Sequence, residues 1–143
     1  MKNFEFWFLN SKFVTVMAGL YFHIPFCKRI CSYCDFFRVA RLTQLAPTVE
    51  VMHREMEEQR NFLSDRNIET IYFGGGTPSL LQPAELERFI SHAAYLWHCA
   101  AVGEITLEAN PEDITAEYVS VLRRTSINRV SLGVQSFDDG ELK

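Results

Sequence analysis

Three cysteines stand close together near the start of the chain, in the run Cys27-Lys28-Arg29-Ile30-Cys31-Ser32-Tyr33-Cys34. This C-x3-C-x2-C spacing lets one short loop bring three thiolates to three corners of an iron–sulfur cubane. A [4Fe-4S] cluster ordinarily takes four cysteine ligands, so three leave one iron open to a ligand from outside the protein. The pattern therefore predicts a cluster with a reactive, open iron.

Two other interpretations of these cysteines stay open at this point. Cys31 and Cys34 alone form a C-x-x-C pair that is typical of a redox dithiol. A structural zinc ion would instead need a fourth ligand, drawn from His23, Asp35 or Cys99. Dense local spacing without a clear secretory signal favours metal over disulfides, so we expect a reducing, cytoplasmic location.

The elements that must position these cysteines alternate along the chain. Strand-like runs cover 19–24, 70–73, 104–108 and 129–134. Helical patterns cover 47–63, a segment from Pro83, and a segment near Thr115, which suits an N-cap. This order predicts an α/β fold with about four parallel strands and intervening helices. We expect the hydrophobic inner face of such a sheet to be poorly covered.

Chemically unusual residues follow these predicted strands. The cysteine loop follows the first, Gly74-Gly75-Gly76-Thr77-Pro78 the second, Glu108 ends the third and Gln135 follows the fourth. Taken singly, each has an ordinary explanation, namely a tight turn, a surface carboxylate or a helix cap. Ligand sites in parallel sheets gather at the carboxyl ends of the strands, which favours one shared site.

Composition narrows the class of protein. The chain has 143 residues, 48% of them hydrophobic, which is enough for one domain with a core. The net charge of −4 argues against nucleic acid as a partner. Residues 1–16 are rich in aromatics but too short and too interrupted to span a bilayer, so we expect an N-terminal extension, with Met17 as an alternative start.

Four blocks of sequence resemble, in order, those of the oxygen-independent coproporphyrinogen III oxidase-like family of radical S-adenosylmethionine (SAM) proteins. The blocks are Tyr21-Phe22-His23-Ile24-Pro25-Phe26-Cys27 with the cysteines that follow, Gly74 to Leu80, Leu107 to Pro111, and Ser131 to Phe137. The resemblance implies a partial (β/α) barrel that binds a [4Fe-4S] cluster and SAM.

The resemblance also implies the residues of the site. The cluster ligands would be Cys27, Cys31 and Cys34. Contacts to SAM would come from Tyr21, Tyr33, Gly75, Gly76, Thr77, Glu108 and Gln135. A glycine-rich edge permits a close backbone approach that a Cβ would obstruct. No such role is implied for His23 or for Cys99, which we expect to be a small buried residue. His53, His92 and His98 lie on predicted helices without a partner pattern, so we expect surface or internally satisfied positions for them.

Within this family, the sequence resembles the heme chaperone branch. The oxidases of the family carry a further cysteine two residues after the third, whereas here Cys34 is followed by Asp35-Phe36-Phe37. The resemblance implies binding of heme or a porphyrin, transfer of heme to an acceptor protein, and an electron donor. An oxygen-independent coproporphyrinogen III oxidase is the alternative enzyme hypothesis.

The resemblance also bears on the extent of the chain. Proteins of this family continue well beyond the position of Lys143, so we expect residues 17–143 to form an incomplete radical SAM core domain. Any heme or porphyrin site is expected beyond Lys143. A third hypothesis is therefore a fragment that has the cofactor site without its function.

Overall fold

Four parallel strands form a single sheet whose order, β1-β2-β3-β4, follows the chain. The computed structural model describes residues 18–63, 67–97, 99–100 and 102–141. The strands are β1 (Ala18–Ile24), β2 (Ile68–Gly75), β3 (Glu104–Ala109) and β4 (Arg129–Leu132). The helices are α1 (Leu45–Glu58), α2 (Pro83–Leu96) and α3 (Ala116–Leu122). The α/β prediction is confirmed, whereas the predicted extension, residues 1–16, lies outside the described residues.

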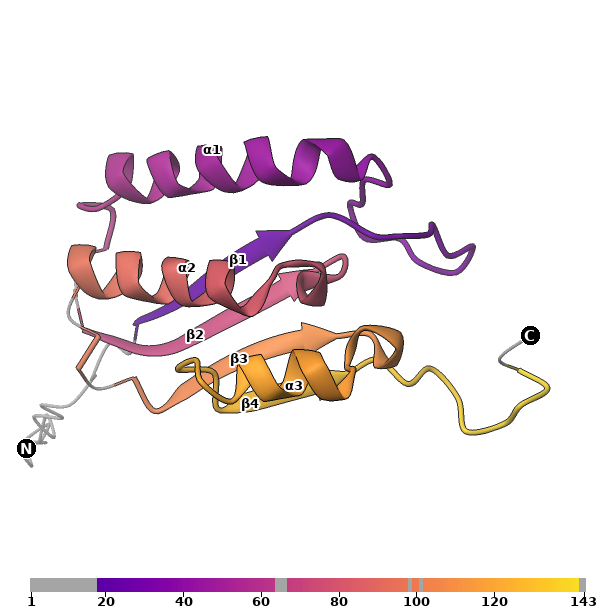
Figure 1. Ribbon diagram of the computed structural model, residues 1–143. Coiled ribbons are helices and arrows are strands. Elements are labelled where there is room, and N and C mark those ends of the chain that lie inside the picture. Colours follow the sequence, from indigo (N-terminus) through magenta and orange to yellow (C-terminus); the bar gives the residue numbers. More distant parts are fainter. Residues whose placement is uncertain (1–17, 64–66, 98, 101, 142–143) are drawn as a thin grey trace, which may run out of the picture.

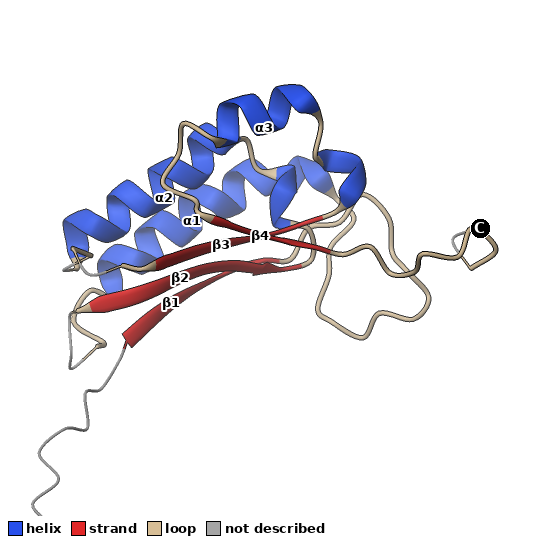
Figure 2. Ribbon diagram, turned by 90° about the horizontal axis from the view of Figure 1, so that it is seen from below, coloured by secondary structure: helices blue, strands red, loops and turns tan. Residues whose placement is uncertain are grey.

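The three helices cover one face of the sheet (Figures 1 and 2). Phe22 of β1 and Phe73 of β2 stack at 5.0 Å between ring centroids, and Phe89 of α2 packs against both. Full burial of one such side chain contributes about 1.5–3 kcal/mol to folding. This aromatic contact holds the helix layer over the centre of the sheet.

Helix ends follow local chemistry. α2 begins at Pro83, as predicted, because proline lacks the N–H that a first helical turn leaves unpaired. The Thr115 hydroxyl accepts a hydrogen bond from the Tyr118 N–H at 3.1 Å, which confirms the predicted N-cap of α3. α1 stops at Glu58 rather than reaching residue 63, because a polar run leads into a turn closed by the Phe62 N–H and the Gln59 carbonyl.

Three short 3-10 turns complete the connections. They are η1 (Leu42–Gln44) before α1, η2 (Pro78–Leu80) after β2, and η3 (Pro111–Asp113) after β3. β4 is also shorter than the predicted 129–134, since its pairing with β3 stops where Ala109 faces Leu132. The segment beyond β4 stays attached to β3 through the Gly133 N–H, which donates to the Ala109 carbonyl at 3.0 Å.

The face of the sheet without helices is polar, so the expectation of a hydrophobic inner face is wrong. Alternate residues of a strand point to opposite faces, and here the alternation separates apolar from polar side chains. The polar face carries Tyr21, His23, Thr70, Tyr72, Glu104, Thr106, Glu108 and Arg129, several of which bond to one another. This face is suited to polar contacts rather than to a dry core.

No helix in the described part of the chain is long and apolar enough to cross a membrane.

Candidate cofactor site at the carboxyl ends of the strands

The glycine turn, residues 74–76, packs directly against the start of the cysteine loop, residues 27–34. The Gly76 N–H donates to the Ile24 carbonyl at 2.8 Å. A Cβ on Gly76 would come within 2.7 Å of the Phe26 carbonyl oxygen and 2.9 Å of the Cys27 Sγ. Gly75 has φ +116°, a left-handed conformation that favours glycine. The glycines are therefore required for the close approach of these two loops.

Glu108 joins the glycine turn to the polar face of the sheet. One carboxylate oxygen accepts from the Tyr72 hydroxyl at 2.6 Å, and the other accepts from the Gly75 N–H at 3.1 Å. The hydrogen bond to Glu108 raises the pKa of Tyr72 to about 12. Tyr21 stacks on Tyr72 at 5.9 Å, and burial raises its pKa too, with a smaller effect of Glu108. Both phenols therefore remain protonated donors at neutral pH.

The cysteine loop is closed at its base and exposed at its tip. The Cys27 N–H donates to the Val39 carbonyl at 3.1 Å, and the Val39 N–H donates to the Pro25 carbonyl at 2.7 Å. The Cys34 N–H donates to the Cys31 carbonyl at 3.3 Å, which makes the second half a tight turn. Arg38 also donates to the Cys31 carbonyl, at 3.3 Å.

The donor set of this loop fits an iron–sulfur cluster. All three thiols are free, with Cys31 exposed and Cys27 and Cys34 partly so. Within the described residues, no three side chains of His, Cys, Asp or Glu are gathered tightly enough to hold a metal ion. The three thiols share one loop whose base is fixed by the hydrogen bonds to Val39.

The three residues that could supply a fourth ligand to zinc are less well placed to join the cysteines of the loop. His23 bonds through Nδ1 to the Tyr21 hydroxyl at 3.2 Å, on the polar face of the sheet. Cys99 packs against the hydrophobic core in the connection between the end of α2 and the start of β3. Burial raises the pKa of the Cys99 thiol, which disfavours the thiolate that a metal requires. Asp35 follows Cys34 directly and is exposed.

The remaining predicted SAM contacts lie around the same edge of the sheet. Thr77 is buried and accepts from the Asn110 side-chain amide at 3.4 Å. Tyr33 lies on the exposed tip of the cysteine loop, where a hydrogen bond with Cys31 raises its pKa. Gln135 has φ 55°, and its amide donates to the Gly133 carbonyl of its own loop at 3.1 Å. The described contacts thus join Tyr21, the glycines, Glu108 and Cys27, but not Tyr33 or Gln135.

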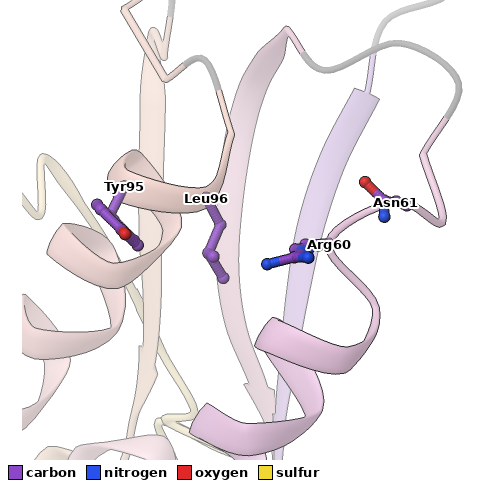
Figure 3. Close-up of a pocket in the computed structure, with 4 residues that line it drawn as sticks. All are labelled: Arg60, Asn61, Tyr95 and Leu96. Carbon is purple, nitrogen blue, oxygen red and sulfur yellow. The ribbon is translucent and has the colours of Figure 1, made fainter.

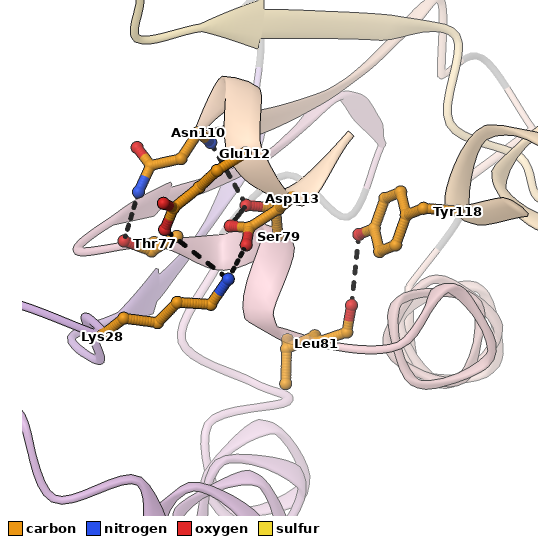
Figure 4. A network of polar contacts seen from close by, with 8 residues as sticks. All are labelled: Lys28, Thr77, Ser79, Leu81, Asn110, Glu112, Asp113 and Tyr118. Carbon is orange, nitrogen blue, oxygen red and sulfur yellow. Dashed lines mark hydrogen bonds and ion pairs between the residues drawn. The ribbon is translucent and has the colours of Figure 1, made fainter. Parts of the chain in front are cut away.

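A polar network, which sequence reasoning missed, connects three loops at this edge (Figure 4). Lys28 pairs with Asp113, and Asp113 accepts from the Ser79 hydroxyl at 2.7 Å. Ser79 in turn accepts from the Asn110 N–H at 3.3 Å. Asn110 belongs to one of the sequence blocks that resemble the family, Leu107 to Pro111. Nothing in the sequence, however, indicates that Lys28 contacts a residue 85 positions away.

His53 and His92 pair with each other, a contact that the sequence pattern does not indicate. Their Nδ1 atoms lie 2.8 Å apart between α1 and α2, and His53 is buried and stacked on Phe89 with ring centroids 4.2 Å apart. The i, i+3 and i+4 spacing within each helix shows which residues share a face, but it does not show which helices pack together. His98 lies outside the described residues.

A hollow at the opposite end of the molecule lacks the residues of the candidate cofactor site. It has a volume of about 370 Å³ and is lined by Arg60, Asn61, Tyr95 and Leu96, near the carboxyl ends of α1 and α2 (Figure 3). None of the predicted cluster or SAM residues lines it.

Comparison with known proteins shows the superfamily to which the chain belongs. Residues 21–143 match the family described as the radical SAM superfamily, and the chain belongs to this superfamily. Membership implies a [4Fe-4S] cluster and SAM as cofactors.

Individual relatives within the superfamily show which proteins the chain is similar to. The chain is 43% identical over 123 residues to the heme chaperone HemW of Lactococcus lactis subsp. lactis (strain IL1403), covering 86% of this chain and 32% of that protein. It is 36% identical over 127 residues to the heme chaperone HemW of Escherichia coli (strain K12), covering 87% of this chain and 34% of that protein. The chain thus spans about a third of the length of these curated relatives.

Comparison of the backbone with a solved structure supports membership of the same superfamily. This structure, coproporphyrinogen III oxidase (HemN) from Escherichia coli, is described as a radical SAM enzyme, and it superimposes with a TM-score of 0.74 at 29% identity. The match covers 85% of this chain and 29% of that chain. The sheet and helices described above therefore correspond to part of a radical SAM fold.

Proposed function

We propose that Cys27, Cys31 and Cys34 hold a [4Fe-4S] cluster whose open iron lies beside the glycine turn, where SAM binds. The observation that supports this proposal is the close approach of Gly76 to Cys27, because a ligand bound along the glycine turn would lie beside the first of the three proposed cluster ligands. A reduced cluster would supply the electron for reductive cleavage of bound SAM.

The protein's own groups would orient SAM. Gly75, Gly76 and Thr77 provide a backbone edge that the cofactor can approach closely, and the Glu108 carboxylate stands at the end of β3 to receive a cationic amino group. Tyr21 would contact SAM from β1, while Tyr33 and Gln135 would close over it from the two exposed loops. Residues 17–143 would thereby form the cofactor-binding part of a radical SAM core.

For the whole protein, we propose the activity of a heme chaperone, which binds heme and transfers it to an acceptor protein in the cytoplasm. Asp35-Phe36-Phe37 after the third cysteine supports this branch, as does the identity with the two HemW proteins. Heme, an acceptor and an electron donor would be its partners.

Anaerobic reconstitution tests the cofactor site. The chain should take up iron and sulfide, show a cluster-type absorption band, and give an EPR signal after reduction that changes when SAM is added. Cys31→Ala should abolish the signal, whereas Cys99→Ala, which alters a thiol at the other end of the molecule, should leave the iron content unchanged. Tight zinc binding without iron would contradict the site.

An oxygen-independent coproporphyrinogen III oxidase is the second candidate, favoured by the match to the solved oxidase structure. Heme titration and product analysis of the protein expressed from its gene separate the two. A chaperone should bind heme stoichiometrically and release it to an acceptor. An oxidase should decarboxylate coproporphyrinogen III and form 5'-deoxyadenosine in proportion.

A further inference from the structure

Lys28 lies between the first and second cysteines and reaches out of the cysteine loop to another element. Its ammonium group pairs with the Asp113 carboxylate in η3 and lies 3.6 Å from the Glu112 carboxylate. Among the residues that the structure describes, these two ion pairs are the ones that tie the cysteine loop to a different element. Figure 4 shows Lys28 extending toward both carboxylates.

The acceptor of this ion pair is nearly withdrawn from solvent. The side chain of Asp113 is 6% exposed, against 45% for Lys28. A buried carboxylate is costly unless charge and hydrogen bonds compensate it. Lys28 supplies the charge, and the Ser79 hydroxyl supplies a hydrogen bond at 2.7 Å to the other oxygen.

Ser79 connects this ion pair to the proposed SAM site. It lies in η2, directly after the glycine turn, and also accepts from the Asn110 N–H at 3.3 Å. The Asn110 side chain then donates to Thr77 at 3.4 Å. A continuous chain of polar contacts thus runs from the cysteine loop through η3 to the residues that follow Gly76.

We infer that Lys28 and Asp113 form a latch that sets the position of the cysteine loop against the glycine turn, and that both are positioning residues for the cluster and for SAM. This inference rests on the proposed function for its effect on SAM, but the latch itself is a property of the protein alone. It acts through the loop and touches neither SAM nor iron.

A matched set of variants separates the latch from a simple change of charge. Lys28→Met removes the ammonium group and keeps the length of the side chain, whereas Lys28→Arg keeps a cation that can still reach Asp113. Arg29→Met removes the neighbouring exposed cation, which makes none of the ion pairs found among the described residues. The net charge of the loop changes equally in Lys28→Met and Arg29→Met.

Hydrogen–deuterium exchange of the cofactor-free chain tests the latch first. The hydrogen-bonded amides of Cys27, Cys34 and Val39 should exchange about tenfold faster in Lys28→Met, the effect of losing one charge-assisted hydrogen bond. Exchange in Lys28→Arg and Arg29→Met should match the unaltered chain. Equal rates in Lys28→Met and the unaltered chain would overturn the latch, whether or not a cluster binds.

The affinity of the reconstituted protein for SAM tests whether the latch affects cofactor binding. Lys28→Met should load the same amount of iron, because its three thiols are intact, yet bind SAM about tenfold more weakly. Lys28→Arg should restore the affinity, and Arg29→Met should not lower it. If Lys28→Met and Arg29→Met weaken SAM binding equally, the loss of a positive charge alone explains the effect, and the positioning role is overturned. Failure of the unaltered protein to take up iron would instead contradict the proposed function, and the exchange result would still decide the latch.

Discussion

Neighbouring residues of β2 serve two different faces of the same sheet. Phe73 is fully buried under α2, where it meets Phe22 and Phe89, whereas Tyr72 faces the opposite side and donates to Glu108. The helix-covered face provides apolar burial, and the open face provides polar groups at the edge where the cysteine loop begins. Because strand residues alternate between faces, stability and cofactor binding can be altered separately at adjacent positions.

Phe73→Ala should have the largest effect on stability. It leaves a cavity among packed aromatic rings, and such truncations cost about 3–5 kcal/mol. Chemical denaturation followed by circular dichroism measures the change in the free energy of unfolding. Tyr95→Ala, which removes an aromatic side chain that is 86% exposed, is the matched control and should be near neutral. A loss below about 1 kcal/mol at Phe73 would contradict its role in the core.

Gly76→Ala should come next, with effects on both the fold and the site. Its Cβ would meet the Phe26 carbonyl and the Cys27 Sγ, so the two loops must separate, at a cost of about 1–3 kcal/mol. We expect reconstituted protein to lose the SAM-dependent change in its EPR signal. Gly103→Ala is the control, because nothing lies within 4 Å of a Cβ built there. An unchanged SAM response in Gly76→Ala would argue against the close approach of these loops.

His53 should make the helix-covered face sensitive to acid. Burial lowers its pKa, with a smaller lowering by Arg88. The folded state therefore favours neutral His53, so the stability is fully present above the ordinary histidine pKa and falls as the pH drops below it. The charged and titratable groups around His53 are Glu50, Arg54 and Glu57 of α1, and Glu85, Arg88 and His92 of α2.

Thermal unfolding across this pH range checks the effect. The Tm should fall by a few degrees between roughly pH 7 and pH 5.5, and this fall should be smaller in His53→Gln. Glu58→Gln, which alters an exposed carboxylate at the end of the same helix and away from His53, controls for general acid effects. The same decrease in His53→Gln and in the unaltered chain would show that other groups cause it.

Tyr72→Phe should have the smallest effect on stability and a selective effect on the site. It removes the hydrogen bond to Glu108 but leaves the stacking with Tyr21, so the free energy of unfolding should fall by about 1 kcal/mol or less. SAM affinity of the reconstituted protein should fall severalfold, since Glu108 would lose one of its two donors. Equal SAM affinity in both proteins would show that Tyr72 does not orient Glu108 for binding.

Local patterns were sufficient to predict the strands and helices and to place the glycine turn and Glu108 at the carboxyl ends of strands. The Thr115 cap, the helix start at Pro83 and the position of the glycine turn depend on neighbours in the chain, so they can be recognised from sequence. The pairs Lys28–Asp113, Tyr72–Glu108 and His53–His92 depend on how separate elements pack. Residue types alone give neither the register of β2 with β3 nor the rotation of α1 against α2.

The sequential strand order also has a consequence for the time course of synthesis. Each strand pairs with the one made just before it, so the sheet can extend by one βα unit at a time as the chain leaves the ribosome. The cysteine loop follows the first strand, while Glu108 and η3 follow the third. The proposed iron ligands are therefore translated well before the η3 carboxylates that pair with Lys28 of their loop.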